Sequence, residues 1–146
     1  MPTYYRWIAQ GENLQAAKRG TLQSSSSTKA YWIFDMTGSY RPSAGVHLDR
    51  VLVGIVFKPE GESILADQSK WIRFPRPEFL GEAKHPDGII VKENEPGAFG
   101  IGQLVLQELN RLIKETRLAS KKEMEKALGP SIPQSQIAAR MRNQRW

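Results

Sequence analysis

The chain has 146 residues, of which 40% are hydrophobic and 25% charged, values typical of one soluble globular domain with an ordinary core. It contains no cysteine, which excludes disulfides, thiolate catalysis and cysteine-ligated metal sites. Its two histidines, His47 and His85, do not have metal-ligand spacing, so we expect no metal cofactor.

The formal charge of +6 is unevenly distributed. Residues 1–102 carry 12 basic and 11 acidic side chains, whereas residues 103–146 carry 9 and 4. A positive last third favours a polyanionic or acidic partner, although a solvated helix with a basic tail is an equal alternative. The longest apolar run, 51–57, is too short to span a bilayer. No N-terminal stretch combines a basic head, an apolar segment and a small-residue cleavage site, so we expect any export signal to lie elsewhere.

The first half of the chain predicts strands joined by a helix and loops. Short runs rich in aromatic and β-branched residues predict strands at 3–8, 30–34, 46–57 and 71–74. Helical spacing over 11–19 ends at Gly20, a predicted C-cap. The serine run 24–27 and the segment 37–45 predict loops, and 58–61 predicts a turn.

Two acidic residues close a later predicted strand. The run from Gly88 leads to Glu93 and Glu95 before Pro96. Because side chains alternate along a strand, the two carboxylates would share one face. Gly97, Gly100 and Gly102 then predict a tight turn that opens a helix at residue 103.

The C-terminal third predicts helix. Leucines and isoleucines at helical spacing run from residue 103, and the helix could continue to Leu128, before Gly129-Pro130. Residues 130–146 form a basic tail or short helix with Arg140, Arg142 and Arg145. The expected fold is α+β, with a small mixed or antiparallel β core, a long C-terminal helix and one domain over 1–129.

Arg6, in the first predicted strand, is a candidate anion-binding residue, since a guanidinium can grip a pyrophosphate through two hydrogen bonds. Glu93 and Glu95 are candidates to stabilise a sugar cation and to prepare an acceptor. The alternatives are a surface arginine stacked on Tyr4 or Trp7 and two solvated acids. Tyr31 could stack on a nicotinamide or adenine ring, with core packing as the alternative.

These pieces together resemble the ADP-ribosyltransferase-like domains at the C-termini of bacterial polymorphic and contact-dependent toxins. The resemblance covers roughly residues 3–110. The matching segments are Tyr4-Tyr5-Arg6, the aromatic strand Tyr31–Phe34, the run Val51–Pro59, and the Glu93/Glu95 strand with its glycines.

The resemblance implies that Arg6 binds NAD, that Glu95 is catalytic and that Glu93 is the partner acid. The family's polar Ser/Thr on the second strand has no clear counterpart here, and Thr37 lies just beyond that strand. Thr37 and Tyr31 are therefore expected to complete the NAD site. No metal is implied.

The implied function is that of a secreted or translocated toxin, acting in a target-cell cytoplasm, with its export signal expected to lie outside this chain; the alternative is a cytoplasmic protein. It would transfer ADP-ribose from NAD to a protein or RNA, or hydrolyse NAD as a glycohydrolase. Arg140, Arg142 and Arg145 would contact the target, and an acidic immunity protein would suit the basic third. No membrane contact is expected.

Two other functions remain open at this point. A metal-independent ribonuclease would use His85 or His47, which show no obvious pairing in the sequence. A non-catalytic RNA-binding module would act through the basic tail, with binding that weakens steeply with salt.

Overall fold

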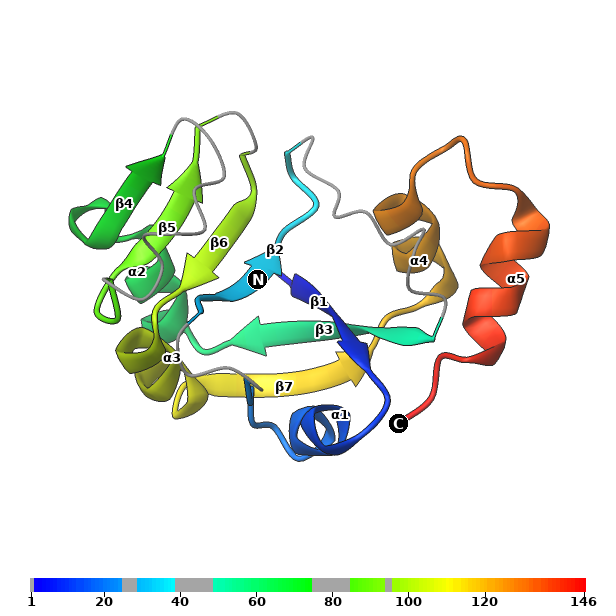
Figure 1. Ribbon diagram of the computed structural model, residues 1–146, viewed down its shortest axis with the longest axis horizontal. Helices are drawn as coiled ribbons and strands as arrows, with labels where there is room; N and C mark the ends of the chain where they lie inside the picture. The colour runs from blue at the N-terminus through cyan, green and yellow to red at the C-terminus, as the bar shows by residue number, and fades with distance from the viewer. Residues whose placement is uncertain (1, 25–28, 39–48, 75–84, 94–95) are drawn as a thin grey trace.

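The computed structural model describes residues 2–24, 29–38, 49–74, 85–93 and 96–146. They form a seven-stranded mixed sheet with helices on both faces (Figure 1). The strands are β1 Tyr4–Ala9, β2 Tyr31–Phe34, β3 Arg50–Phe57, β4 Trp71–Phe74, β5 Ile89–Lys92, β6 Ala98–Ile101 and β7 Ile113–Leu118. The helices are α1 Glu12–Lys18, α2 Pro59–Ala66, the 3-10 turn η1 Gln68–Lys70, α3 Gln103–Asn110, α4 Lys121–Leu128 and α5 Gln134–Arg142.

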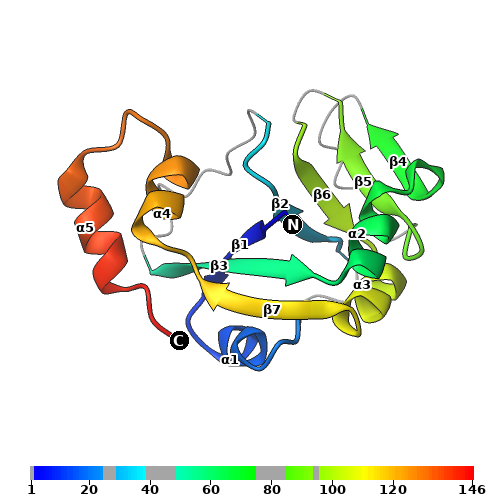
Figure 2. The same cartoon turned by 180° about the vertical axis from the view of Figure 1, so that it is seen from behind.

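The strand order is β4-β5-β6-β2-β1-β3-β7. Only the β4–β5 pair is parallel, and every other pairing is antiparallel. This arrangement confirms a mixed sheet combined with helices. In both views β4, β5 and β6 lie at one end of the molecule, while α4 and α5 lie side by side at the other (Figures 1 and 2).

Alternating side chains give the sheet two apolar faces. The first, here the α1–α3 face, carries Tyr4, Ile8, Tyr31 and Ile33, and α1, α2 and α3 cover it. The second, the α4–α5 face, is covered by Met124 and Ala127 of α4 and Ile137 of α5. It carries four buried side chains from the strands, Tyr5, Trp7, Phe34 and Leu52. Arg6 lies between Tyr4 and Ile8 along β1, so it points to the α1–α3 face.

Backbone pairing is interrupted in the middle of the sheet. β1 pairs with β3 along its whole length, from Tyr4 to Ala9. With β2, on its other side, it shares the single register pair Tyr5↔Phe34. We call the region beyond that pair, between Arg6-Trp7 of β1 and Tyr31-Trp32 of β2, the strand split.

The predicted long C-terminal helix is wrong. α3 ends at Asn110, and β7 and α4 follow as separate elements. The Asn110 side chain accepts a hydrogen bond from the Leu22 amide (2.7 Å) and donates one to the Leu22 carbonyl (3.0 Å), which ties the helix end to a distant segment. The next residues then pair with β3. Tertiary pairing therefore overrides helical spacing in this segment.

Three further elements differ from the sequence prediction. The predicted turn at 58–61 is the start of α2, with Pro59 at its first position. The glycine-rich segment contains β6, and Gly100 within it leaves room for the Trp32 indole, since a Cβ there would lie 2.8 Å from Trp32 Cζ2. β5 ends at Lys92, before the two glutamates. Within the described residues, no helix is long and apolar enough to cross a membrane.

Candidate functional site

Arg6 occupies the strand split. Its Nη1 donates a hydrogen bond to the Trp32 carbonyl at 2.8 Å, joining β1 to β2 where their backbones no longer pair. The guanidinium carbon lies 4.1 Å from the centre of the Tyr31 ring. The arginine is therefore held between a carbonyl and an aromatic face, in a geometry that favours cation–π attraction.

The surroundings of Arg6 are apolar and positive. Burial lowers the pKa of the guanidinium, and the charge of Arg50 lowers it further, while Tyr31 acts in the opposite direction. An arginine stays protonated under such conditions. Among the described residues, no carboxylate forms an ion pair with Arg6. A desolvated cation without an acidic partner is energetically costly, and an anionic ligand would relieve that cost.

Tyr31 is 1% exposed. Burial raises the pKa of its hydroxyl, and the nearby Arg6 charge opposes that rise. The sequence prediction grouped Arg6 and Tyr31, and the structure brings them into contact. The tyrosine lies beneath the arginine and belongs to the core of the α1–α3 face.

Thr37 lies beyond the end of β2 and is exposed. Its hydroxyl donates to Asp35 Oδ1 at 2.7 Å, and its amide donates to the same oxygen at 3.1 Å.

The Tyr4 hydroxyl has a raised pKa of about 12. Burial is the main cause, and the charges of Asp35 and Glu62 add to it. Two carboxylates therefore act on the Tyr4 end of the α1–α3 face, two residues along β1 from Arg6.

Of the two glutamates of the sequence prediction, the structure describes one. Glu93 directly follows β5 and is exposed. Glu95 lies outside the described residues, as does His47, a residue of the ribonuclease alternative. His85, the other histidine, lies in the turn before β5, where its carbonyl accepts a hydrogen bond from the Gly88 amide (3.1 Å).

The three tail arginines do not share one environment. Arg140 is 3% exposed, and its guanidinium lies 5.5 Å from the centre of the Trp7 ring on the α4–α5 face. Arg142 and Arg145 are exposed. Arg145 lines an open cavity of about 300 Å³ together with Gln10, Asp49 and Asn143. Of the three, Arg142 and Arg145 therefore lie at the surface, and Arg140 does not.

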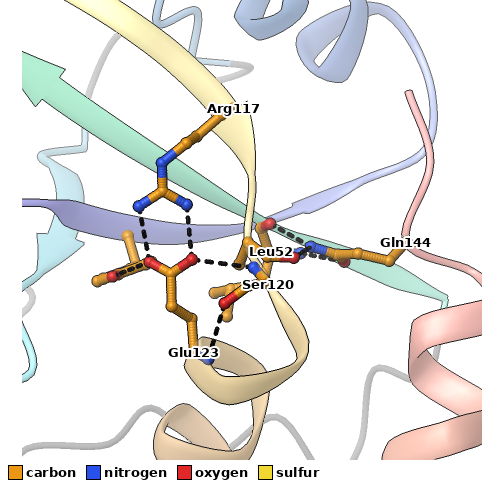
Figure 3. Close-up of polar contacts among 7 residues, drawn as sticks. Leu52, Arg117, Ser120, Glu123 and Gln144 are labelled. Carbon is orange, nitrogen blue, oxygen red and sulfur yellow. Dashed lines mark hydrogen bonds and ion pairs between the residues drawn. The ribbon is translucent and has the colours of Figure 1, made fainter.

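The segment after α5 is docked on the sheet. The Gln144 side chain accepts a hydrogen bond from the Leu52 amide (3.0 Å) and donates to the carbonyls of Leu52 (2.6 Å) and Ala119 (3.2 Å). Figure 3 shows this amide reaching the backbone beside the start of α4. The predicted basic tail therefore packs against the same sheet as the rest of the chain.

A polar cluster that the sequence prediction missed connects α4 to the sheet (Figure 3). Arg117 donates to both carboxylate oxygens of Glu123, at 2.6 and 2.8 Å, and Tyr5 donates to Glu123 Oε2. Ser120 caps α4: its amide donates to Glu123 Oε1 at 2.9 Å, and its hydroxyl accepts from the Glu123 amide at 3.2 Å. The Ser-x-x-Glu spacing is a capping box, which was the signal in the sequence.

This cluster, here the Arg117–Glu123 clamp, has strongly shifted acid–base properties. The hydrogen bonds from Arg117 lower the pKa of Glu123 to about 2. Burial and the hydrogen bond to Glu123 raise the pKa of Tyr5 to about 12, and the same carboxylate raises that of Arg117. Because the Glu123 carboxylate accepts from Arg117 of β7 and Tyr5 of β1, the clamp anchors α4 to both strands.

No group of three or more His, Asp or Glu side chains arranged to hold a metal occurs in the part of the chain that the structure describes. No family model matches this chain, and neither the curated proteins nor the solved structures contain a match.

Proposed function

We propose that this protein is a toxin-type ADP-ribosyltransferase that cleaves NAD and transfers ADP-ribose to a macromolecular target. The observation that carries the proposal is the Arg6 guanidinium, held in the strand split and stacked on Tyr31, with no acidic partner among the described residues. A fixed, desolvated guanidinium is suited to a pyrophosphate, the anionic part of NAD.

In the proposed reaction, Arg6 grips the pyrophosphate and Glu95 stabilises the ribosyl cation as the nicotinamide–ribose bond breaks. Nicotinamide leaves with the electron pair of that bond. A nucleophilic group on the target then bonds to the ribose carbon, and Glu93 accepts its proton. With water in place of the target, the same steps hydrolyse NAD.

The exposed arginines at the C-terminal end, Arg142 and Arg145, are proposed to contact the target. The excess of basic residues over 103–146 also suits an acidic immunity protein. An effector of this kind would act in the cytoplasm of a target cell.

The test is NAD consumption by the purified protein, with and without cell lysate. Arg6→Lys and Glu95→Ala are each expected to lower turnover by about 100-fold or more, because each removes an interaction needed in the transition state. Arg111→Lys and Glu108→Gln change exposed residues at and just after α3 and serve as matched controls that keep wild-type rates.

Glu93→Gln separates the two reactions. We expect it to abolish transfer to the target while NAD hydrolysis continues, since Glu93 acts on the acceptor and water can reach the ribosyl cation without being positioned by it. Absence of NAD turnover in the wild-type protein, with and without lysate, would remove the proposal and turn attention to RNA cleavage.

A further inference from the structure

The burial of Tyr31 is inconsistent with direct contact to a ligand. At 1% exposure its ring has no free face to offer a nicotinamide or an adenine. One face of the ring instead lies under the Arg6 guanidinium, 4.1 Å from its carbon. Any effect of Tyr31 on binding must therefore pass through Arg6.

Tyr31 and the next residue hold Arg6 in two complementary ways. The ring supports the guanidinium carbon from one side, 4.1 Å from the ring centre, and the Trp32 carbonyl, 2.8 Å from Nη1, holds one of its nitrogens. A guanidinium has five N–H donors in a rigid fork. One donor is used on Trp32, and the position of the others is set by the same two contacts.

An aromatic partner differs from an acidic one in a way that matters for anion binding. A carboxylate would neutralise the guanidinium and compete with an anionic ligand for its donors. A ring attracts the cation through its quadrupole and takes none of the N–H groups. Tyr31 thus orients Arg6 without using its hydrogen-bonding capacity.

We propose that Tyr31 is a positioning residue, which holds the Arg6 guanidinium in the orientation that binds a pyrophosphate. This inference rests on the proposed function for the choice of ligand. The sequence prediction had Tyr31 contact NAD itself. In this proposal Tyr31 supports Arg6, and Arg6 contacts NAD.

The test compares ADP-ribose binding by wild type, Tyr31→Phe and Tyr31→Leu. Tyr31→Phe keeps the ring and should bind within about twofold of wild type, whereas Tyr31→Leu should bind about tenfold more weakly, a typical effect for a desolvated cation–π contact. Binding is followed by NMR through the Arg6 Nε–H signal, which is assigned by its loss in Arg6→Lys.

A second readout reports the contact directly. The δ protons of Arg6 should show an upfield ring-current shift in wild type and in Tyr31→Phe, and lose it in Tyr31→Leu. Thermal unfolding of each variant gives its folded fraction at the temperature of the binding measurement. Affinities are then compared only between variants that are equally folded. If Tyr31→Leu does not fold, Tyr31→Met, with a longer and more flexible apolar side chain, takes its place.

Three results would overturn the inference: equal affinity in wild type and the non-aromatic variant, equal weakening by Phe and Leu, or no response of Arg6 to ADP-ribose in wild type. Failure of the proposed function has a different signature. Ring-dependent ADP-ribose binding without NAD consumption would retain the positioning role and remove the transferase reaction.

Discussion

Two arginines on opposite faces of one sheet illustrate two uses of a guanidinium. Arg117, on the α4–α5 face, donates to both oxygens of Glu123 at 2.6 and 2.8 Å. Arg6, on the α1–α3 face, has a carbonyl and a ring as its partners among the described residues. The first arrangement completes a structural anchor, and the second leaves a positive charge in the strand split without a carboxylate partner among the described residues.

The difference follows from the neighbouring residues. Gly54 lies opposite both Tyr5 and Arg117, and the lack of a side chain lets the Arg117 guanidinium cross β3 to reach Glu123. Arg6 is flanked instead by the apolar Tyr4 and Ile8 on its face of β1. A mutation at either arginine therefore tests a different property, stability at one and binding at the other.

The largest expected effect on stability comes from breaking the Arg117–Glu123 clamp. Glu123→Ala removes the carboxylate that Arg117, Tyr5 and Ser120 share, and should lower the free energy of unfolding by about 2–3 kcal/mol. Urea unfolding measures the change. Glu125→Ala, two residues along the same helix, is the control. If Glu123→Ala lowers the free energy of unfolding no more than Glu125→Ala does, the clamp is not an anchor.

Acid should weaken the same clamp. Because the pKa of Glu123 in the folded protein is about 2, below its ordinary value of 4.5, its contribution is complete above pH 4.5 and disappears as the pH falls to about 2. Urea unfolding of wild type and Glu123→Gln across this range should therefore give curves that converge at low pH. A constant difference between them would contradict the assigned pKa.

Tyr5→Phe should have a smaller effect, about 1 kcal/mol, since one hydrogen bond to the carboxylate is lost while the ring keeps its packing. The pKa of Tyr5 in the folded protein is raised to about 12, so its effect on stability depends on pH. The hydroxyl stabilises the fold below pH 10, and that contribution is lost as the pH rises to 12. Thermal unfolding at pH 7 and pH 11 measures both. An equal stability difference at the two pH values would be evidence against the assigned pKa.

The smallest change in stability is expected at Arg6. Replacing a desolvated cation by an apolar chain of similar length, as in Arg6→Met, should alter the free energy of unfolding by less than about 1 kcal/mol, because relief from desolvation offsets the lost bond to Trp32. ADP-ribose binding should disappear in the same variant. A large loss of stability would mean that Arg6 is mainly structural.

Local pattern predicts several strands and helices well, among them β5 after Gly88 and the start of α3 at residue 103. Predicted strands at 3–8, 30–34, 71–74 and within 46–57 are confirmed as β1, β2, β4 and β3, and the helix over 11–19 as α1. Their aromatic and β-branched composition, or their helical spacing, agrees with their tertiary environment.

The elements that were missed depend on contacts between distant segments. The predicted helix from residue 103 included Ile113 and Leu118, yet these residues begin and end a strand, β7, because β3 offers it a paired edge. β6 is a strand although it contains a glycine, since the Trp32 indole occupies the space above that residue. Neither contact can be read from a local window of sequence.

The candidate site shows the same division. Arg6 and Tyr31 were both predicted from residue type and strand position, but their contact depends on the single pairing of β1 with β2. Arg140 was grouped with two exposed arginines, and the packing of α5 against Trp7 buries it. The Ser120–Glu123 capping box was visible in the sequence, whereas its link to Tyr5 across 118 residues was not.

The sequence alone thus determined the composition of the two apolar sheet faces, the main strands and the position of Arg6 on a strand, because periodicity and propensity are local properties. Only the tertiary structure decided where helix yields to strand, which arginines are buried and which of them meets a carboxylate. Those outcomes depend on long-range pairing and desolvation, which act between residues far apart in the chain.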